Sequence, residues 1–217
     1  MAGRRGRSSF GLSVCAGAAL LAFAPCVASA GQVSLSVGGG GFFPSNSLVS
    51  ELRPDGLVRL KSASGVAGTV QLTGWLGRRL GLEAQALYIS APLELEADID
   101  GQDPIAFEDD GTHLVGGLHL LFAFYRPPLE PTALYASVGV TFVQRGGPFF
   151  DEPPLDEEPT SIGWALGLGA RRGIARGLYL RLDARDFVTN YAPNDEYGER
   201  QQHDLVATVG LEWLLRR

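Results

Sequence analysis

The chain has 217 residues, enough for one domain with a sizeable core, and its 45% hydrophobic and 19% charged residues are near the globular average. Without its first 30 residues it would carry 15 basic and 24 acidic residues, a formal net charge of −9, which argues against nucleic acid as a partner. Beyond that first segment, no run of 18 apolar residues exists, so the sequence predicts no membrane-spanning helix.

Residues 1–30 have the pattern of a secretory signal peptide. Basic residues lie at positions 4, 5 and 7, residues 11–24 are apolar and small, and Ala28 and Ala30 form an A-x-A cleavage site. The alternative, a membrane anchor, needs an apolar run of about 20 residues, which this segment lacks. Both cysteines lie here, so the mature chain, residues 31–217, would hold no disulfide.

The mature chain alternates between apolar and polar residues in eight segments. Residues 178–187 show the pattern clearly, because leucines and an alanine at even positions oppose Tyr179, Arg181, Asp183 and Arg185. This is the period of a strand with one apolar and one polar face. Each predicted strand has about 10 residues, the length that a tilted strand needs to cross a bilayer. The predicted strands are residues 32–43, 65–76, 80–89, 112–125, 132–144, 160–171, 178–187 and 203–215.

The connections between these segments alternate strictly between long and short. The long ones are residues 44–64, 90–111, 145–159 and 189–201, and the short ones are residues 77–79, 126–131 and 172–176. Outer-membrane barrels have short periplasmic turns and long outer loops, whereas a soluble sandwich has no reason to keep this order. The sequence predicts an eight-stranded antiparallel up-and-down transmembrane β-barrel with both termini periplasmic. A secreted β-sandwich or lipocalin-like barrel is the alternative.

Aromatic residues cluster near both ends of the predicted strands, as expected for girdles at the two membrane interfaces. Trp75 has the wrong parity to face lipid, which indicates a bulge or a register error there. The expected outer-end residues are Phe42, Phe43, Tyr88, Phe142, Trp164 and Phe187, and the expected periplasmic-end residues are Trp75, Phe122, Phe124, Tyr125, Tyr135, Tyr179 and Trp213.

Three segments carry a resemblance to a known family. They are residues 163–171 (GWALGLGAR), residues 180–186 (LRLDARD) and residues 209–213 (VGLEW). With them, the whole mature chain resembles the OmpA/OmpX-type eight-stranded outer-membrane barrel domain of Gram-negative bacteria. Such barrels usually end on an aromatic residue read by the insertion machinery. Here Trp213 is followed by four more residues, so either Trp213 serves or insertion is less efficient.

Six charged residues fall on the parity that faces the predicted lumen. Charges inside a narrow barrel are costly unless they are paired. One hypothesis is a gated conduction path in which ion pairs exchange partners. The favoured one is a salt-bridged plug, because an eight-stranded barrel has little room beyond its own side chains. The six residues are Glu83, Arg171, Arg181, Asp183, Arg185 and Glu212.

Other candidate chemistry is weak. The acidic run at positions 94, 96, 98, 100 and 103 lacks the spacing of a calcium-binding EF-hand loop, since position twelve is Phe107 and Pro104 interrupts it. A looser divalent-cation site or a solvated loop fits better. His113 and His203 are expected near the outer rim, His119 inside, and no histidine–serine–acid arrangement stands out. We therefore expect no enzyme, and no catalytic, cofactor-binding or metal site.

These patterns predict an outer-membrane protein with a structural or surface-interaction role. A narrow porin-like channel, a membrane-embedded lipid-modifying enzyme and a soluble lipocalin-like binder are the alternatives, in that order. The expected partners are outer-membrane lipid, lipopolysaccharide and the barrel-insertion machinery. The chain is expected to act as a monomer, with no periplasmic peptidoglycan-binding domain after the barrel.

Overall fold

The computed structural model describes residues 31–45, 47–53, 56–99, 105–126, 131–147, 160–191 and 200–216. The expected signal peptide, with Ala28 and Ala30, lies outside these residues. Strands and short turns make up the described part. No helix in that part is long and apolar enough to cross a membrane.

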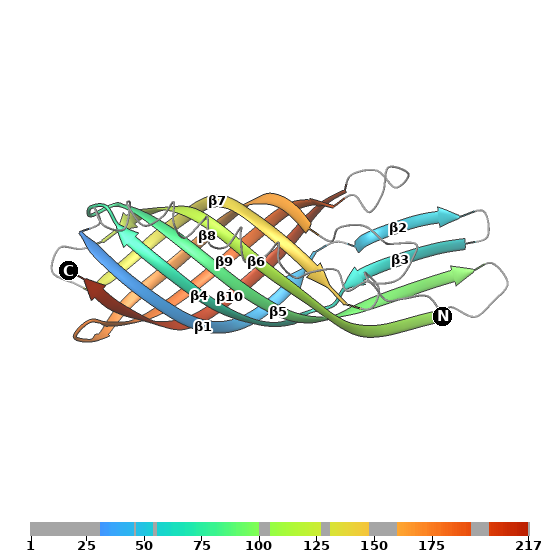
Figure 1. The fold of residues 1–217 in the computed structure, drawn as a ribbon, viewed down its shortest axis with the longest axis horizontal. Helices are drawn as coiled ribbons and strands as arrows, with labels where there is room; N and C mark the ends of the chain where they lie inside the picture. The colour runs from blue at the N-terminus through green and yellow to red at the C-terminus, as the bar shows by residue number, and fades with distance from the viewer. Residues whose placement is uncertain are drawn as a thin grey trace, which may run out of the picture.

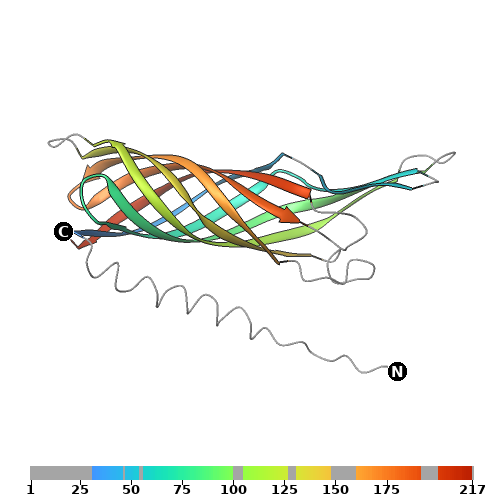
Figure 2. The same cartoon turned by 90° about the horizontal axis from the view of Figure 1, so that it is seen from above.

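The fold is a closed antiparallel barrel of eight strands, as predicted (Figures 1 and 2). Successive barrel strands pair with each other, and pairing of the last strand with the first closes the cylinder. The alternating segments therefore have the up-and-down order expected from the connections. The barrel strands are β1 (Gln32–Pro44), β4 (Gly65–Trp75), β5 (Leu80–Ile99), β6 (Ile105–Tyr125), β7 (Thr132–Gly146), β8 (Thr160–Ala175), β9 (Leu178–Tyr191) and β10 (Arg200–Arg216).

The two ends of the barrel differ. One end of the barrel is here called the turn end. At this end, residues 76–79 join β4 to β5 and a two-residue turn joins β8 to β9. The C-terminus lies at the same end (Figure 1). We call the opposite end the loop end. Short connections therefore gather at the turn end, in agreement with the sequence.

The loop end carries a sheet extension where the sequence predicts only loops. Residues 44–64, expected to be a connection, contain the hairpin of β2 (Ser47–Arg53) and β3 (Gly56–Ser62). This hairpin adds to the edge of β5, which continues to Ile99 instead of ending at residue 89. Strand β6 likewise begins at Ile105 instead of residue 112. Both views show the extension projecting beyond the barrel (Figures 1 and 2).

The connection between β8 and β9 also differs from the prediction. Residues 172–176 were expected to be a turn containing Gly173, but β8 continues to Ala175. The turn falls on Arg176 and Gly177 instead, and Gly177 has a φ of 77°. Only glycine adopts this left-handed conformation without steric cost, so Gly177, and not Gly173, suits the tight reversal.

Candidate functional site

A charge network crosses the barrel interior between β5 and β9. Glu83 is fully buried and receives hydrogen bonds from both Arg181, at 2.6 Å, and Arg185. Arg181 Nε lies 2.6 Å from Asp183 Oδ2, and Arg185 Nη2 lies 3.1 Å from Asp183 Oδ1. Two carboxylates and two guanidinium groups thus compensate one another, as buried charges must.

Neutral groups extend this network through further hydrogen bonds. Thr73 Oγ1 donates to Glu83 Oε2 at 2.7 Å, and the Tyr135 hydroxyl donates to Asp183 Oδ1 at 3.0 Å. Arg185 Nη1 donates to Gln85 Oε1 at 2.8 Å. Donors and acceptors come from four strands, so the network ties together opposite sides of the barrel wall.

The other two predicted lumen charges form a separate pair nearer the turn end. Arg171 Nη1 and Glu212 Oε1 are 2.8 Å apart, and both side chains are buried. Ser34 Oγ donates to the same glutamate oxygen at 2.6 Å. The Arg171 guanidinium lies over the rings of Trp75 and Tyr179, at 4.9 and 5.0 Å from their centres. The structure thus brings the six residues together as a group of four and a group of two.

An apolar layer lies beyond the charge network, toward the loop end. On β9, Phe187 follows Arg185 on the inward face and is 1% exposed. On β5, Leu87 and Ile89 follow Gln85 in the same way. The layer fills the barrel between the charge network and the loop end. Its members are Phe42, Ala67, Leu87, Ile89, Ala91, Val115, Val143, Ala165, Phe187 and Val206.

A second polar cluster lies on the loop-end side of the apolar layer and is centred on Arg145. This side chain donates to Ser161 at 2.7 Å, to Gln202 at 2.9 Å and to Thr189 at 3.1 Å. Asp204 lies 3.8 Å away. This cluster was not predicted, because the sequence pattern places Arg145 at the start of the 145–159 connection. Its inward parity on an extended β7 is the signal that could have identified it.

The three histidines occupy different environments. His119 is buried between Gly117 and Gly139, where a β-carbon at either glycine would come within 2.6 Å of a ring nitrogen. His113 is buried too, close to Ser62 Oγ at 3.1 Å. His203 lies on the outward face near the loop end.

The outward face near the loop end also holds a histidine–aspartate contact that the sequence did not reveal. His203 Nδ1 and Asp186 Oδ2 are 2.7 Å apart, and both side chains are partly exposed. The nearby Ser45 hydroxyl donates to the His203 main-chain oxygen at 2.9 Å, and no bond joins it to the imidazole ring. The arrangement orients the histidine but supplies no activated nucleophile.

An apolar belt covers the outside of the barrel. We use this name for the exposed outward-facing aliphatic residues of the barrel strands. Small residues between them, such as Gly68 and Ala86, keep the belt free of charge. Its large members include Val37, Val70, Leu118, Leu120, Val138, Val140, Leu166, Leu168, Leu180, Leu182, Val209 and Leu211.

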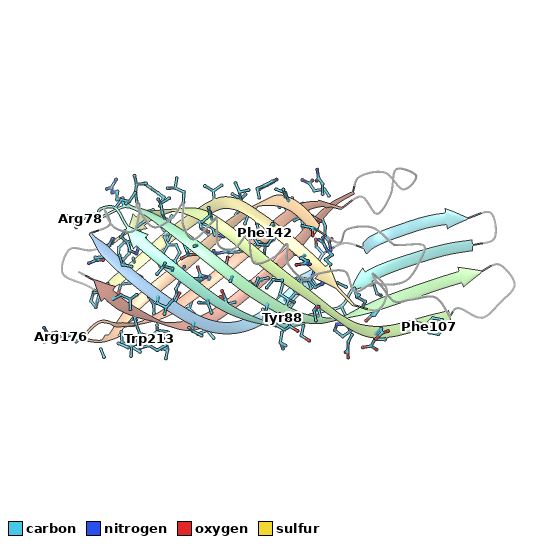
Figure 3. The ribbon with its side chains drawn as sticks, viewed as in Figure 1. Arg78, Tyr88, Phe107, Phe142, Arg176 and Trp213 are labelled. Atoms are coloured by element: carbon cyan, nitrogen blue, oxygen red, sulfur yellow. The ribbon has the colours of Figure 1, made fainter. Side chains whose placement is uncertain are left out.

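Aromatic residues border the belt at both ends. The exposed rings of Phe43, Tyr88 and Trp164, with the half-buried Phe142, lie toward the loop end. Figure 3 shows Tyr88 and Phe142 far from Trp213, which lies at the turn end. The other exposed rings toward the turn end are those of Phe122, Phe124 and Tyr125.

Five aromatic residues expected in these girdles, including Tyr135, which is 1% exposed, are inside the barrel instead. Trp75, 2% exposed, packs edge-on against the Tyr135 ring, and Phe42 packs against the His113 ring. Phe187 belongs to the apolar layer. Tyr179 is half-buried against Arg171. The register around Trp75 is regular in the β1–β4 and β4–β5 ladders, so its inward position follows from parity and needs no bulge.

The acidic run, interpreted as either a looser divalent-cation site or a solvated loop, is described only in part. Glu94 is paired with Lys61 at 3.0 Å, and the other acidic side chains of the run lie outside the described ones. No group of three histidine, cysteine or acidic side chains among the described residues could hold a metal ion.

Comparison with known proteins identifies similar solved structures. No family model matches the chain, and no curated protein matches its sequence. The outer membrane protein OprG from Pseudomonas aeruginosa is 14% identical, with a TM-score of 0.63, and the match covers 87% of this chain and 97% of OprG. Neisserial surface protein A (NspA) is 12% identical, with a TM-score of 0.56, and the match covers 84% and 96%. At these identities the likeness shows the fold alone.

Proposed function

We propose that this protein is a bacterial outer-membrane β-barrel that stabilises the envelope and presents its loop end at the cell surface. The main observation in favour of this proposal is that the distribution of polar and apolar residues is inverted relative to a soluble barrel. Ion pairs are buried inside, and the apolar belt is exposed outside. A soluble barrel would expose its charges and bury its leucines, because contiguous exposed apolar surface is unfavourable in water. A hydrocarbon surrounding accounts for both features.

The extension at the loop end supports the proposed position of the bilayer. Along the outward face of β5, the residues change from Leu82, Ala86 and Tyr88 to Ser90 and Glu94. The change falls just past the aromatic border, where a strand would leave the hydrocarbon for water. On this basis the extension is an extramembrane platform for surface interactions. We also propose that the protein is related to the OmpA/OmpX-type barrels and acts as a monomer. Its proposed partners are the lipopolysaccharide around it and the barrel-insertion machinery.

The interior favours a filled barrel over a conducting channel. Moving from the turn end to the loop end, an ion would meet the Arg171–Glu212 pair, the network around Glu83, the apolar layer and the Arg145 cluster. An apolar layer opposes the passage of ions because it offers them no replacement for water. We therefore propose that the ion pairs serve stability, and we assign the protein no enzymatic reaction.

Cysteine labelling tests the proposed location and orientation. The mature chain is expected to contain no cysteine, so Glu108→Cys and Arg176→Cys each introduce one exposed thiol, at the loop end and the turn end respectively. In a Gram-negative host, a membrane-impermeant maleimide should label the first variant on intact cells. The second should react only after the outer membrane is permeabilised.

Two outcomes would contradict the proposal. Labelling of the Arg176→Cys variant on intact cells, with the Glu108→Cys variant protected, would reverse the orientation. Recovery of both variants in the soluble fraction would remove the protein from the membrane altogether. The wild-type chain, which should remain unlabelled, is the control for non-specific reaction.

A further inference from the structure

The turn end carries four exposed arginines, here called the arginine collar. Arg78 and Arg79 lie between β4 and β5, whereas Arg172 and Arg176 lie near the β8–β9 turn. None of them forms an ion pair with another described residue. The described acid at this end, Glu212, is buried and belongs to Arg171. No acid among the described residues of this end therefore neutralises the four exposed side chains.

The collar lies directly beside the apolar belt. Leu76 and Leu80, each 47% exposed, flank the Arg78–Arg79 pair in sequence. On β8, the outward row runs from Leu168 through Ala170 to Arg172. Figure 3 places Arg78 and Arg176 at the same end as Trp213, whose ring is 42% exposed. Aromatic rings prefer the headgroup level, so the collar lies at the height of the lipid phosphates.

Arg126 holds part of the collar in place. Arg126 donates to the main-chain oxygens of Gly77 and Arg78, both at 3.2 Å, and to Gln32 Oε1 at 2.6 Å. Its guanidinium also lies over the Trp75 ring. These contacts tie the β4–β5 turn to the barrel wall, so Arg78 and Arg79 project from a fixed backbone.

Charge is separated along the barrel axis. The loop end exposes Glu108, Asp109 and Asp110, whereas the exposed charged side chains among the described residues of the turn end are all arginines. A protein with an excess of acidic residues thus concentrates exposed arginines at one interface. General solubility does not require this arrangement, because a net negative chain would remain soluble without it.

We propose that the arginine collar binds the phosphate headgroups of anionic glycerophospholipids in the leaflet at the turn end. Guanidinium groups bind phosphate oxygens in a bidentate manner, and each basic residue near an anionic surface strengthens association. The inference rests on the proposed membrane function and adds the class of lipid and the residues that select it.

Lipid retention tests the collar. The mature chain is refolded into vesicles of phosphatidylcholine alone, or with a minority of phosphatidylglycerol, and then extracted into detergent for native mass spectrometry. Retained phosphatidylglycerol should exceed its vesicle share by roughly fivefold, because one arginine near an anionic surface changes binding by about that factor. The quadruple variant Arg78→Gln, Arg79→Gln, Arg172→Gln, Arg176→Gln should retain only the bulk share.

Control variants separate local recognition from net charge. Lysine at all four positions should keep most of the preference, because the charge remains. Neutralising Glu108, Asp109 and Asp110 to their amides makes the chain more positive at the opposite end and should leave retention unchanged. If the quadruple glutamine variant does not fold, the two double variants, one for each turn, should each show partial loss.

The outcomes are separable. No phosphatidylglycerol preference in the wild type, or an equal preference in the glutamine variants, overturns the collar proposal. Loss of the lipid to low concentrations of inorganic phosphate would identify a free-phosphate site and overturn it too. In these cases, a folded band from pure phosphatidylcholine vesicles would leave the membrane function intact. No folded band in either vesicle, with solubility in plain buffer, would contradict the membrane function itself.

Discussion

Val138→Arg is expected to destabilise the folded barrel in lipid by about 2–4 kcal/mol, the cost of a basic residue near the bilayer midplane. Val138 is 48% exposed on the outward face of β7, opposite Leu120 on one side and Leu166 on the other. No acidic side chain lies opposite in either neighbouring strand to compensate an arginine. The measurement is a urea unfolding titration in vesicles, followed by gel mobility.

Gln144→Arg is the matched control for this prediction. Gln144 lies on the same strand and the same face, but at the loop end, next to Thr160 of β8. An arginine at position 144 should cost about 1 kcal/mol or less, because the free-energy penalty for a basic residue falls toward the membrane interface. Val138→Ala reports the loss of the valine side chain alone. Equal stability of the two arginine variants would mean that the apolar belt does not face hydrocarbon.

Glu83→Gln is expected to lower the free energy of unfolding by about 3–5 kcal/mol, the usual cost of breaking a buried ion pair. The change preserves shape but removes the carboxylate between Arg181 and Arg185. Asp183 would then be the only acid in direct contact with two buried guanidinium groups. The same urea titration in vesicles measures the effect.

A double-mutant cycle distinguishes charge compensation from altered packing. If charge dominates, Glu83→Gln combined with Arg185→Gln should cost less than the sum of the two single changes, because one acid and one base are removed together. Glu108→Gln on the exposed extension should leave stability nearly unchanged. Additive effects of the two interior substitutions would refute the network as a coupled unit.

Alternation and connection length were sufficient to predict the barrel, because lipid and lumen impose opposite polarity on successive residues. The extension was not predicted, because residues 44–64 and 90–111 were interpreted as loops between the barrel strands. Yet residues 58–61 also alternate, with Arg59 and Lys61 on one parity and Val58 and Leu60 on the other. A strand in water has no fixed length, so its bounds depend on its partners, here β5, which sequence alone does not supply.

The interior was only partly predictable. Parity alone identifies Arg181, Asp183 and Arg185 as inward, but their partner Glu83 is 98 residues from Arg181, and the contact depends on how the barrel closes. Phe187 was wrongly predicted to lie on the outside of the barrel. It shares the parity of those charges, yet aromatic identity suggested a girdle. The Asp186–His203 pair joins residues that are not directly opposite in the ladder, so it required the register of β9 and β10.

A closed barrel that is stable in lipid with its charges inside can be tested by gel mobility. The mature chain is refolded into phosphatidylcholine vesicles and run with and without boiling. We expect a compact band that migrates faster without boiling and shifts to the unfolded position on heating. A single band at the unfolded position, from a chain that stays monodisperse in detergent-free buffer, would contradict it.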